Sequence, residues 1–343
     1  MEKIRGLNLG GWLVLEKWMT PELYKDSIAE DEYHLLSSIP YAEERLKKHR
    51  DNFILESDFE WISKKGINTV RIPLGHWTFK AEKPYFEAKR YLDNAFRWAE
   101  KYNLNVVLDV HAAKGCQNGF DNGGLSGICE WHKDVNNVNN TIDFIRDLCE
   151  NYSKEKSLVG IELLNEPSIT IDIDIIQSFY LEGYSVIRKH LGDEIIVIFH
   201  DAFRINEWNN FFKDNNFVNV YLDTHMYQVF GDIENETDIF RLYNFILKDR
   251  LEVIRKIKID IPIIIGEWSI GLSKKLVSKA RDNFQYMAYL RSIANLLFLV
   301  FEEANGWFFW NYKLSDQSTE NNPGWSFKKM VELNILPFDK ERF

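Results

Sequence analysis

The sequence predicts a single (β/α)8 barrel, or TIM barrel, and three observations support this fold class. Short apolar runs recur along the chain, helical patterns separate them, and eight such runs can be counted. Strands and helices that alternate within one domain are typical of a parallel sheet, and eight repeats are typical of a closed barrel. Because no Pro-, Gly- or Ser-rich linker divides the chain, we expect one domain that spans residues 1–343.

The eight predicted strands are mostly continuous runs of Val, Ile and Leu, without the polar alternation of a half-exposed sheet. Continuous apolar strands are expected where a parallel sheet is covered on both faces. We place the strands at residues 4–9, 67–72, 104–110, 158–164, 194–199, 218–224, 261–267 and 306–311.

Amphipathic helices are predicted between these strands. The segment 57–66 has apolar residues at helical spacing, with Ser57 as the expected N-cap and Gly66 as the stop. The same pattern is found in segments 90–103, 139–152 and 240–257.

The connections differ in length on the two sides of the strands. Those that enter strands are as short as KKG, KYN and LGD, whereas long ones follow strands at 17–52, 111–137, 225–239 and 311–324. In this barrel the loops that follow the strands build the active-site face. We therefore expect the functional site at the carboxyl ends of the strands.

The composition is that of a soluble globular protein, with 45% hydrophobic and 27% charged residues. A net charge of −10 and the lack of a Lys/Arg cluster argue against a nucleic-acid partner. Aromatic residues make up 15% of the chain, which suits either a well-packed core or a groove that stacks sugar rings. The sequence implies no protein partner.

The N-terminus does not show the pattern of a signal peptide, so we expect a cytoplasmic protein; the alternative is an extracellular one whose leader has been removed. The apolar run at 292–301 is too short to span a bilayer, so we expect no membrane association. Cys116, Cys129 and Cys149 form no CxxC pair, and we interpret them as reduced thiols, with one disulfide plus a free thiol as the alternative. No zinc-ligand spacing accompanies them, and we expect no metal and no cofactor.

Residues that a buried apolar strand does not need stand at the ends of six strands, namely Arg71, His111, Asn165, Glu166, His225, Tyr227, Glu267 and Trp310. Each alone has an ordinary explanation, such as a salt bridge for the arginine or a structural role for a histidine. Together they would meet at one mouth of the barrel, where burying so many polar groups is costly unless they bind one another or a ligand. The set therefore indicates a functional site.

Two carboxylates that face each other without a metal are the groups that glycoside hydrolysis needs. One carboxyl group protonates the leaving oxygen, and the other attacks the anomeric carbon or activates water. We expect Glu166 and Glu267 to lie about 5–5.5 Å apart, as in a retaining enzyme. Asn165 would bind a sugar hydroxyl, and Tyr227 would donate a hydrogen bond to the carboxylate nucleophile. The Trp310 ring would stack against the face of a pyranose ring.

The ordered motifs RIP, DxH, LNEP, HxY and GEW, followed by a Trp, resemble those of glycoside hydrolase family 5 over essentially the whole chain. Longer stretches, among them RGLNLGGWLVLEKW, KGINTVRIPLGHW, QNGFDNGG and HMYQVFGD, resemble its exo-β-1,3-glucanase branch. This resemblance implies a glycoside hydrolase catalytic domain in which Glu166 is the acid/base and Glu267 the nucleophile. It implies that the terminal glucose is surrounded by Arg71, His111, Asn165, His225, Tyr227 and Trp310.

The same resemblance assigns roles to residues in the long loops. Glu16 corresponds to a carboxylate that binds sugar hydroxyls, and Asp121 falls at a position that narrows the site in this branch. Phe120 and Phe230 match an aromatic pair that clamps the next sugar at the entrance; without the resemblance, both could be core aromatics. One departure is Cys116, which stands where serine is common in the loop after the DxH motif.

The predicted activity is the release of glucose from the non-reducing end of β-1,3-glucans or β-glucosides by a retaining, two-glutamate mechanism. The alternatives are an endo-β-1,4-glucanase of the same family, a β-glucosidase that acts on a small or lipid aglycone, and a barrel that binds carbohydrate without catalysis. A barrel that metabolises phosphosugars is disfavoured, because GEWSIGLSKK makes no convincing phosphate loop. We expect Arg71 to lower the pKa of Glu267, and burial beside a negative Glu267 to raise the pKa of Glu166.

Overall fold

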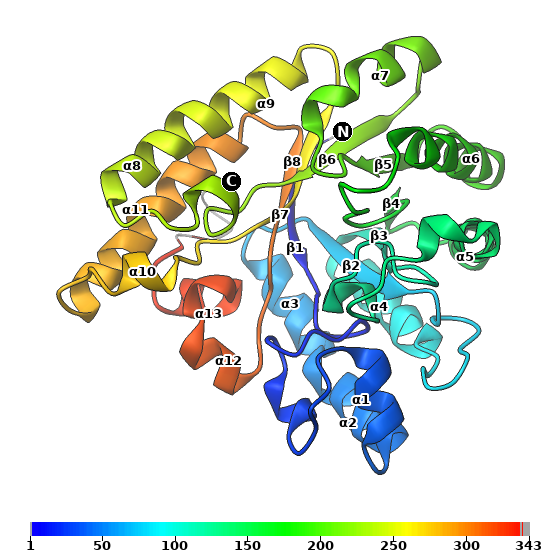
Figure 1. The fold of residues 1–343 in the computed structure, drawn as a ribbon, viewed down its shortest axis with the longest axis horizontal. Coiled ribbons are helices and arrows are strands. Elements are labelled where there is room, and N and C mark those ends of the chain that lie inside the picture. The colour runs from blue at the N-terminus through cyan, green and yellow to red at the C-terminus, as the bar shows by residue number, and fades with distance from the viewer. Residues whose placement is uncertain (1, 337, 339–343) are drawn as a thin grey trace.

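Eight parallel strands pair in chain order and close into a barrel, because the last strand pairs with the first. In the computed structural model, which describes residues 2–336 and 338, helices surround these strands (Figure 1). The strands are β1 Ile4–Asn8, β2 Thr69–Gly75, β3 Asn105–Ala112, β4 Leu158–Glu162, β5 Ile196–His200, β6 Val220–His225, β7 Ile263–Trp268 and β8 Gly306–Phe309. Each overlaps a predicted strand, and the predicted (β/α)8 fold is confirmed.

The helices form the outer ring, together with short helices in the loops at the carboxyl ends of the strands. Aspartate side chains at 134, 172 and 282 cap α5, α6 and α11 by accepting backbone N–H groups of the first turn. The α-helices are α1 Glu32–Ser38, α2 Ala42–Phe53, α3 Glu56–Lys64, α4 Lys89–Tyr102, α5 Val135–Tyr152, α6 Ile173–Leu191, α7 Asn209–Asn215, α8 Ile239–Asn244, α9 Leu251–Lys258, α10 Lys274–Val277, α11 Asn283–Phe301, α12 Asp316–Asn321 and α13 Phe327–Glu332, with a π-helical turn at Phe245–Arg250.

The helix predicted at 57–66 begins earlier than expected. Helix α3 starts at Glu56, so Ser57 lies in its first turn and is not the N-cap. The N-cap is Leu55, whose backbone N–H donates to Asp58 Oδ2 at 2.9 Å. An acidic side chain three residues into the helix thus provides the cap that the sequence analysis assigned to the serine.

The barrel interior has an apolar floor beneath a polar layer. Phe308 fits into the floor because Gly6 has no side chain, since a Cβ there would lie 2.0 Å from the phenyl ring. The floor consists of Ile4, Val107, Ile196, Ile198, Ile264 and Phe308. Nearer the carboxyl ends, the strands carry buried polar residues instead, namely Asn8, Arg71, Asp109, Glu162 and Asp223.

The long connections after the strands contain structure of their own. The segment between β1 and β2 folds into α1 and α2, which lie at the lower edge of the view in Figure 1. Their apolar residues form a second core with Trp77 and Tyr85, whose rings stack with centroids 4.0 Å apart. This core supports the loops that flank the mouth of the barrel.

Helix α11 is long and apolar enough to cross a membrane when only length and composition are considered. In the structure it packs against the barrel as one of the outer helices (Figure 1). Leu290, Ile293, Leu297 and Phe301 along one side of this helix are buried in the main core. An apolar stripe of this kind is expected of a helix that covers a parallel sheet.

Candidate active site

The polar layer is organised around Arg71, which is fully buried on β2. Burial favours its neutral form, but Asp109 and Glu162 outweigh burial and hold the pKa of Arg71 well above its ordinary value. The guanidinium group is therefore a permanent positive charge. Its nitrogen atoms contact Glu162 Oε2 at 2.7 Å, Asn8 Oδ1 at 2.8 Å, Asn165 Oδ1 at 2.8 Å, Asp109 Oδ2 at 3.1 Å and Glu267 Oε1 at 3.3 Å.

Glu267 lies on β7, and both of its carboxylate oxygens are held by donors. Arg71 donates to Oε1 at 3.3 Å, and the Tyr227 hydroxyl donates to Oε2 at 2.7 Å. These two contacts orient the carboxylate at the mouth of the barrel and leave only 5% of the residue exposed. A carboxylate fixed in this way is arranged to act as a nucleophile.

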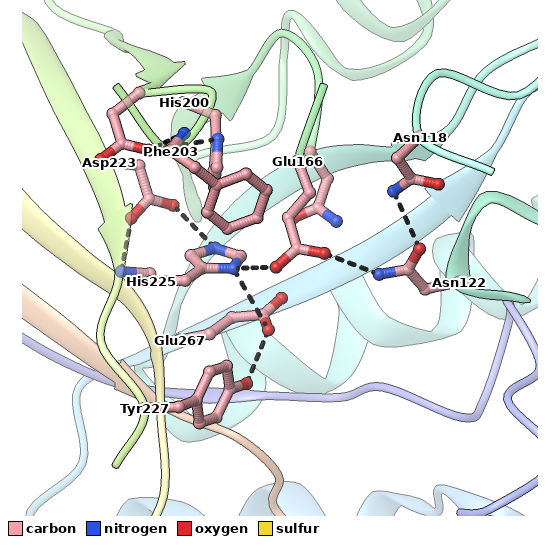
Figure 2. A network of polar contacts seen from close by, with 12 residues as sticks. Asn118, Asn122, Glu166, His200, Phe203, Asp223, His225, Tyr227 and Glu267 are labelled. Atoms are coloured by element: carbon pink, nitrogen blue, oxygen red, sulfur yellow. Dashed lines mark hydrogen bonds and ion pairs between the residues drawn. The ribbon is translucent and has the colours of Figure 1, made fainter. Parts of the chain in front are cut away.

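Glu166 follows β4 with a φ of +43°, a left-handed conformation that is uncommon for a residue with a side chain. Its Oε1 lies 2.7 Å from His225 Nδ1, and its Oε2 accepts a hydrogen bond from Asn122 Nδ2 at 2.8 Å (Figure 2). The turn after β4 thus directs this carboxyl group toward β6 and β7.

His225 joins the two glutamates, because its Nδ1 also lies 3.4 Å from Glu267 Oε2 (Figure 2). The two carboxylate oxygens can therefore be no farther apart than the sum of 2.7 and 3.4 Å. For this pair of oxygens the limit is compatible with the roughly 5–5.5 Å that separates the carboxyl groups of a retaining enzyme.

The pKa values of the two glutamates shift in the directions opposite to those expected from the sequence. Burial, with nearby Glu166, raises the pKa of Glu267 although His225 and Arg71 oppose the shift. Burial also acts to raise the pKa of Glu166, but the hydrogen bond and charge of His225 outweigh it and lower that pKa to about 2. The expectation was wrong because it left out His225, whose own pKa the surrounding carboxylates hold well above its ordinary value despite burial.

Two further side chains present unused polar atoms at the same place. His111 Nδ1 lies 2.6 Å from Asp109 Oδ2, which leaves Nε2 buried and without a partner. Asn165 uses its oxygen for Arg71 and leaves its Nδ2 donor likewise without a partner. Buried groups in this state are suited to bind the hydroxyl groups of a ligand. The Trp310 ring stacks on His111 at 5.5 Å and adds a flat apolar face.

Comparison with known proteins agrees with this geometry. The family model for cellulase, glycosyl hydrolase family 5, matches residues 43–315. A glucan 1,3-beta-glucosidase of Kluyveromyces lactis is 32% identical, with 98% of this chain and 88% of the relative covered. A probable glucan 1,3-beta-glucosidase A of Emericella nidulans is 34% identical, with 98% and 90% covered. The chain belongs to glycoside hydrolase family 5. It is a glycosidase, and the enzymes of this family are retaining.

Solved structures match the fold of this family 5 glycosidase. The rutinosidase from Aspergillus niger superposes with a TM-score of 0.82 at 19% identity, and the match covers 97% of each chain. The Clostridial cellulose synthase subunit Z from Clostridioides difficile gives a TM-score of 0.61 at 18% identity, with 96% of each chain covered. These likenesses support the barrel architecture.

A pair of acidic residues lies near the two glutamates of the polar layer. Glu16 is buried, and its Oε2 accepts a hydrogen bond from Trp18 Nε1 at 2.8 Å. Burial and then the charge of Asp121 raise the pKa of Glu16 well above its ordinary value. Burial also raises the pKa of Asp121, which lies in the loop after β3. Glu16 and Asp121, from the loops after β1 and β3, therefore lie close enough for their charges to interact.

The two predicted clamp residues lie at the surface. Phe120 and Phe230 are 55% and 60% exposed, so neither belongs to the core. The Phe230 ring lies 5.5 Å from the Tyr227 ring and 6.3 Å from the Trp325 ring. An exposed ring that borders Tyr227, the residue that donates to Glu267, is suited to contact a sugar at the entrance. Whether Phe120 and Phe230 clamp one sugar stays a prediction.

Several residues that shape the site were missed by the sequence analysis. Asn122 stands next to Asp121 in the GFDNGG motif, but only the geometry shows that its amide contacts Glu166. Trp18 and Trp325, with centroids 5.3 Å apart, extend the aromatic surface beyond Tyr227. Glu162 could have been noticed, because a lone charge inside an apolar strand needs a buried partner such as Arg71.

Two groups of ligand-type side chains lie close together among the described residues, namely Glu166–His200–His225 and Glu162–Asp223–His225. Burial lowers the pKa of His200 to about 3, so its ring is neutral. Its Nδ1 accepts the Ala202 backbone N–H at 3.0 Å, so the ring hydrogen is on Nε2 and no lone pair remains for a metal. In the second group, Glu162 is paired with Arg71 at 2.7 Å.

Proposed function

We propose that this family 5 glycosidase releases glucose from the non-reducing end of β-1,3-glucans or β-glucosides, with Glu267 as nucleophile and Glu166 as acid/base. One observation carries the proposal: a single nitrogen atom of His225 lies within 3.4 Å of an oxygen from each glutamate. The relatives named glucan 1,3-beta-glucosidase, with near-complete coverage of the chain, support the β-1,3-glucan substrate.

In the first step, Glu267 Oε attacks the anomeric carbon while the bond from this carbon to the leaving oxygen breaks. The leaving oxygen takes a proton from Glu166, and a covalent glucosyl-enzyme forms. Tyr227 and Arg71 orient the attacking carboxylate through contacts of 2.7 and 3.3 Å. The electron pair of the broken bond stays on the leaving oxygen, which departs as a neutral hydroxyl.

The proton for this step is shared by Glu166 and His225. The contact between Oε1 and Nδ1 is 2.7 Å, and one proton in it is held mainly by His225, as the pKa directions of the two groups indicate. A shift across this contact makes Glu166 a neutral acid without any change in the net charge of the site. His225 therefore supplies the proton that Glu166 needs to act as an acid.

In the second step, water attacks the anomeric carbon from the side that the leaving group has vacated. Glu166, now a carboxylate, takes a proton from this water, and the bond between glucose and Glu267 breaks. Two inversions at the same carbon give a product with the β configuration. The pair of Glu166 and His225 regains its single proton, which completes the cycle.

The exo mode of action rests on Glu16 and Asp121. Both have a raised pKa, so the pair is suited to hold a proton as well as to accept hydrogen bonds from sugar hydroxyls. Because they come from long loops after β1 and β3, they would stop a chain from continuing beyond the terminal glucose. Phe120 and Phe230 would then contact the sugar that leaves.

Product analysis on laminarioligosaccharides, cello-oligosaccharides and an aryl β-glucoside tests this function. We expect glucose as the only early product from laminarioligosaccharides, together with hydrolysis of the aryl β-glucoside. Internal cleavage of cello-oligosaccharides would instead favour an endo-β-1,4-glucanase. Hydrolysis of the aryl glucoside alone would favour an enzyme for small or lipid aglycones, and no hydrolysis would overturn the proposal.

A further inference from the structure

Two asparagines in the loop after β3 are linked by hydrogen bonds to Glu166, the proposed acid/base. Asn122 Nδ2 donates to Glu166 Oε2 at 2.8 Å, and Asn118 Nδ2 donates to Asn122 Oδ1 at 3.0 Å (Figure 2). Asn118 is 7% exposed, and the segment is anchored next to β4, where the Ser168 backbone N–H donates to Gln117 O at 3.0 Å. The two amides therefore form a chain that ends at the catalytic carboxyl group.

The direction of this chain is set by a backbone donor. The Phe120 backbone N–H donates to Asn118 Oδ1 at 2.9 Å, and a backbone N–H cannot accept. The Cys116 thiol lies 3.5 Å from the same oxygen and adds a second donor on that side. The nitrogen of Asn118 must then face Asn122, so that the nitrogen of Asn122 must face Glu166.

We propose that Asn118 and Asn122 form an amide relay that presents a hydrogen-bond donor to Glu166 Oε2 and so positions the acid/base in both steps. Asn122 can only donate in this contact, because its own oxygen already accepts from Asn118. Oε2 is thus kept as an acceptor, and the exchangeable proton of Glu166 stays at Oε1 beside His225. This inference rests on the proposed function, since it assigns a purpose to residues around its acid/base.

The relay has a chemical consequence for the proton of the pair. Among the described residues, His225 is contacted by Glu166, Glu267, Asp223 and His200, and its charge also interacts with that of Asp201. When the pair of Glu166 and His225 loses its proton to the leaving group, a bare carboxylate remains at Glu166. The donated hydrogen of Asn122 stabilises that carboxylate. Burial acts to raise the pKa of Glu166, and the hydrogen bond from Asn122 adds to the larger effects of His225 and His200 that lower it. The pair therefore releases its proton more easily than it would without the relay.

Asn118→Asp reverses the direction of the hydrogen bonds in the relay, because the side chains of Asn and Asp have almost the same shape but an Asp carboxylate cannot donate. One oxygen of the new carboxylate still accepts from the Phe120 N–H, but the other can no longer donate to Asn122. The Asn122 amide must then turn, which places its carbonyl oxygen against Glu166 Oε2 and favours a protonated Glu166. A negative charge at position 118 acts in the same direction.

The test is the pH dependence of kcat/KM on an aryl β-glucoside for the full chain. We expect Asn118→Asp to move the alkaline limb to higher pH by about one unit, with a lower kcat at the optimum and KM within about twofold. Asn122→Ala, which removes the donor without reversing it, should move the limb in the same direction by less. Asn139→Asp adds the same charge on an exposed part of α5 and is the matched control, for which we expect the limb of the parent enzyme.

The outcomes separate the relay from the proposed function. An alkaline limb unchanged in both Asn118→Asp and Asn122→Ala would overturn the relay, even if activity fell, because a purely structural role lowers activity at every pH. If Asn118→Asp does not fold, as judged by its circular dichroism, Asn122→Ala decides alone. If the parent enzyme itself hydrolyses no β-glucoside, the proposed function is overturned, and the relay is overturned with it because it has no acid/base to position.

Discussion

Arg71 and Phe230 represent two regions of the site that differ in nearly every physical respect. Arg71 is fully buried and contacts five polar side chains, whereas Phe230 is 60% exposed and touches other aromatic rings. The buried region has one arrangement that satisfies its charges, so it can hold two carboxylates in reacting geometry. Residues in the exposed region can be substituted with little loss of folding stability. This region can therefore determine which leaving group the enzyme accepts.

The largest effect is expected for the nucleophile in the buried region. Glu267→Gln keeps the shape of the side chain but removes the charge that attacks the anomeric carbon, and we expect kcat to fall on the order of 10⁴-fold or more. The loss should be equal on a laminarioligosaccharide and on an aryl β-glucoside, at every pH. A loss below tenfold on either substrate would rule out the assigned role.

Arg71→Met removes the charge that compensates buried carboxylates. Asp109 and Glu162 are both fully buried, so their unpaired charges should lower the free energy of unfolding by about 3–5 kcal/mol. Denaturant unfolding measures the change. The matched control is Arg255→Met, whose solvent-exposed pair with Glu303 should contribute little to the free energy of unfolding. Equal losses in the two variants would contradict the view of Arg71 as the centre of the site.

The shared proton predicts a particular pH dependence. Activity should require an ionised Glu267, whose raised pKa places the acidic limb above the ordinary value of about 4.5. The alkaline limb reports loss of the proton from the pair of Glu166 and His225. Because the carboxylates around His225 raise its pKa, this limb should lie above the ordinary histidine value of about 6.5.

His225→Gln sharpens this prediction, because its sign depends on where the proton is stored. With the imidazole gone, the proton must be held by Glu166 alone, and the alkaline limb should fall by at least about one pH unit. If Glu166 instead acted without the proton of His225, the substitution would remove the imidazole that lowers the pKa of Glu166. The limb would then move to higher pH, and the shared-proton account would be wrong.

The smallest effect is expected at the entrance. Phe230→Ala removes one exposed ring, and the loss of an aromatic contact is worth on the order of 1 kcal/mol. KM on a β-1,3-oligosaccharide should rise several-fold, while KM on an aryl glucoside with a good leaving group changes less. Phe284→Ala, an exposed ring at the start of α11, is the control. Equal losses on both substrates would mean that Phe230 supports the fold or the terminal-glucose site.

The contrast between the buried and the exposed region also explains which features of the fold and the site could be predicted from the sequence. The barrel and the buried residues Arg71, Asn165 and Glu267 were predictable, because charged or amide groups at the ends of apolar strands are improbable without a function. The direction of the two glutamate pKa shifts was not predictable, since it depends on a 2.7 Å contact between Glu166 and His225. Asn122 was missed for the same reason, as a polar residue in a polar loop carries no pattern that distinguishes it.

The central claim is that Glu267 attacks the anomeric carbon, and a trapped intermediate tests it most directly. A 2-deoxy-2-fluoro-β-glucosyl fluoride slows the second step and lets the glucosyl-enzyme accumulate. Mass spectrometry of the protein, followed by peptide mapping, locates the added sugar. The account predicts one fluoroglucosyl group per chain, attached to Glu267 and absent from Glu267→Gln. Attachment to another residue, or inactivation without any attached sugar, would contradict it.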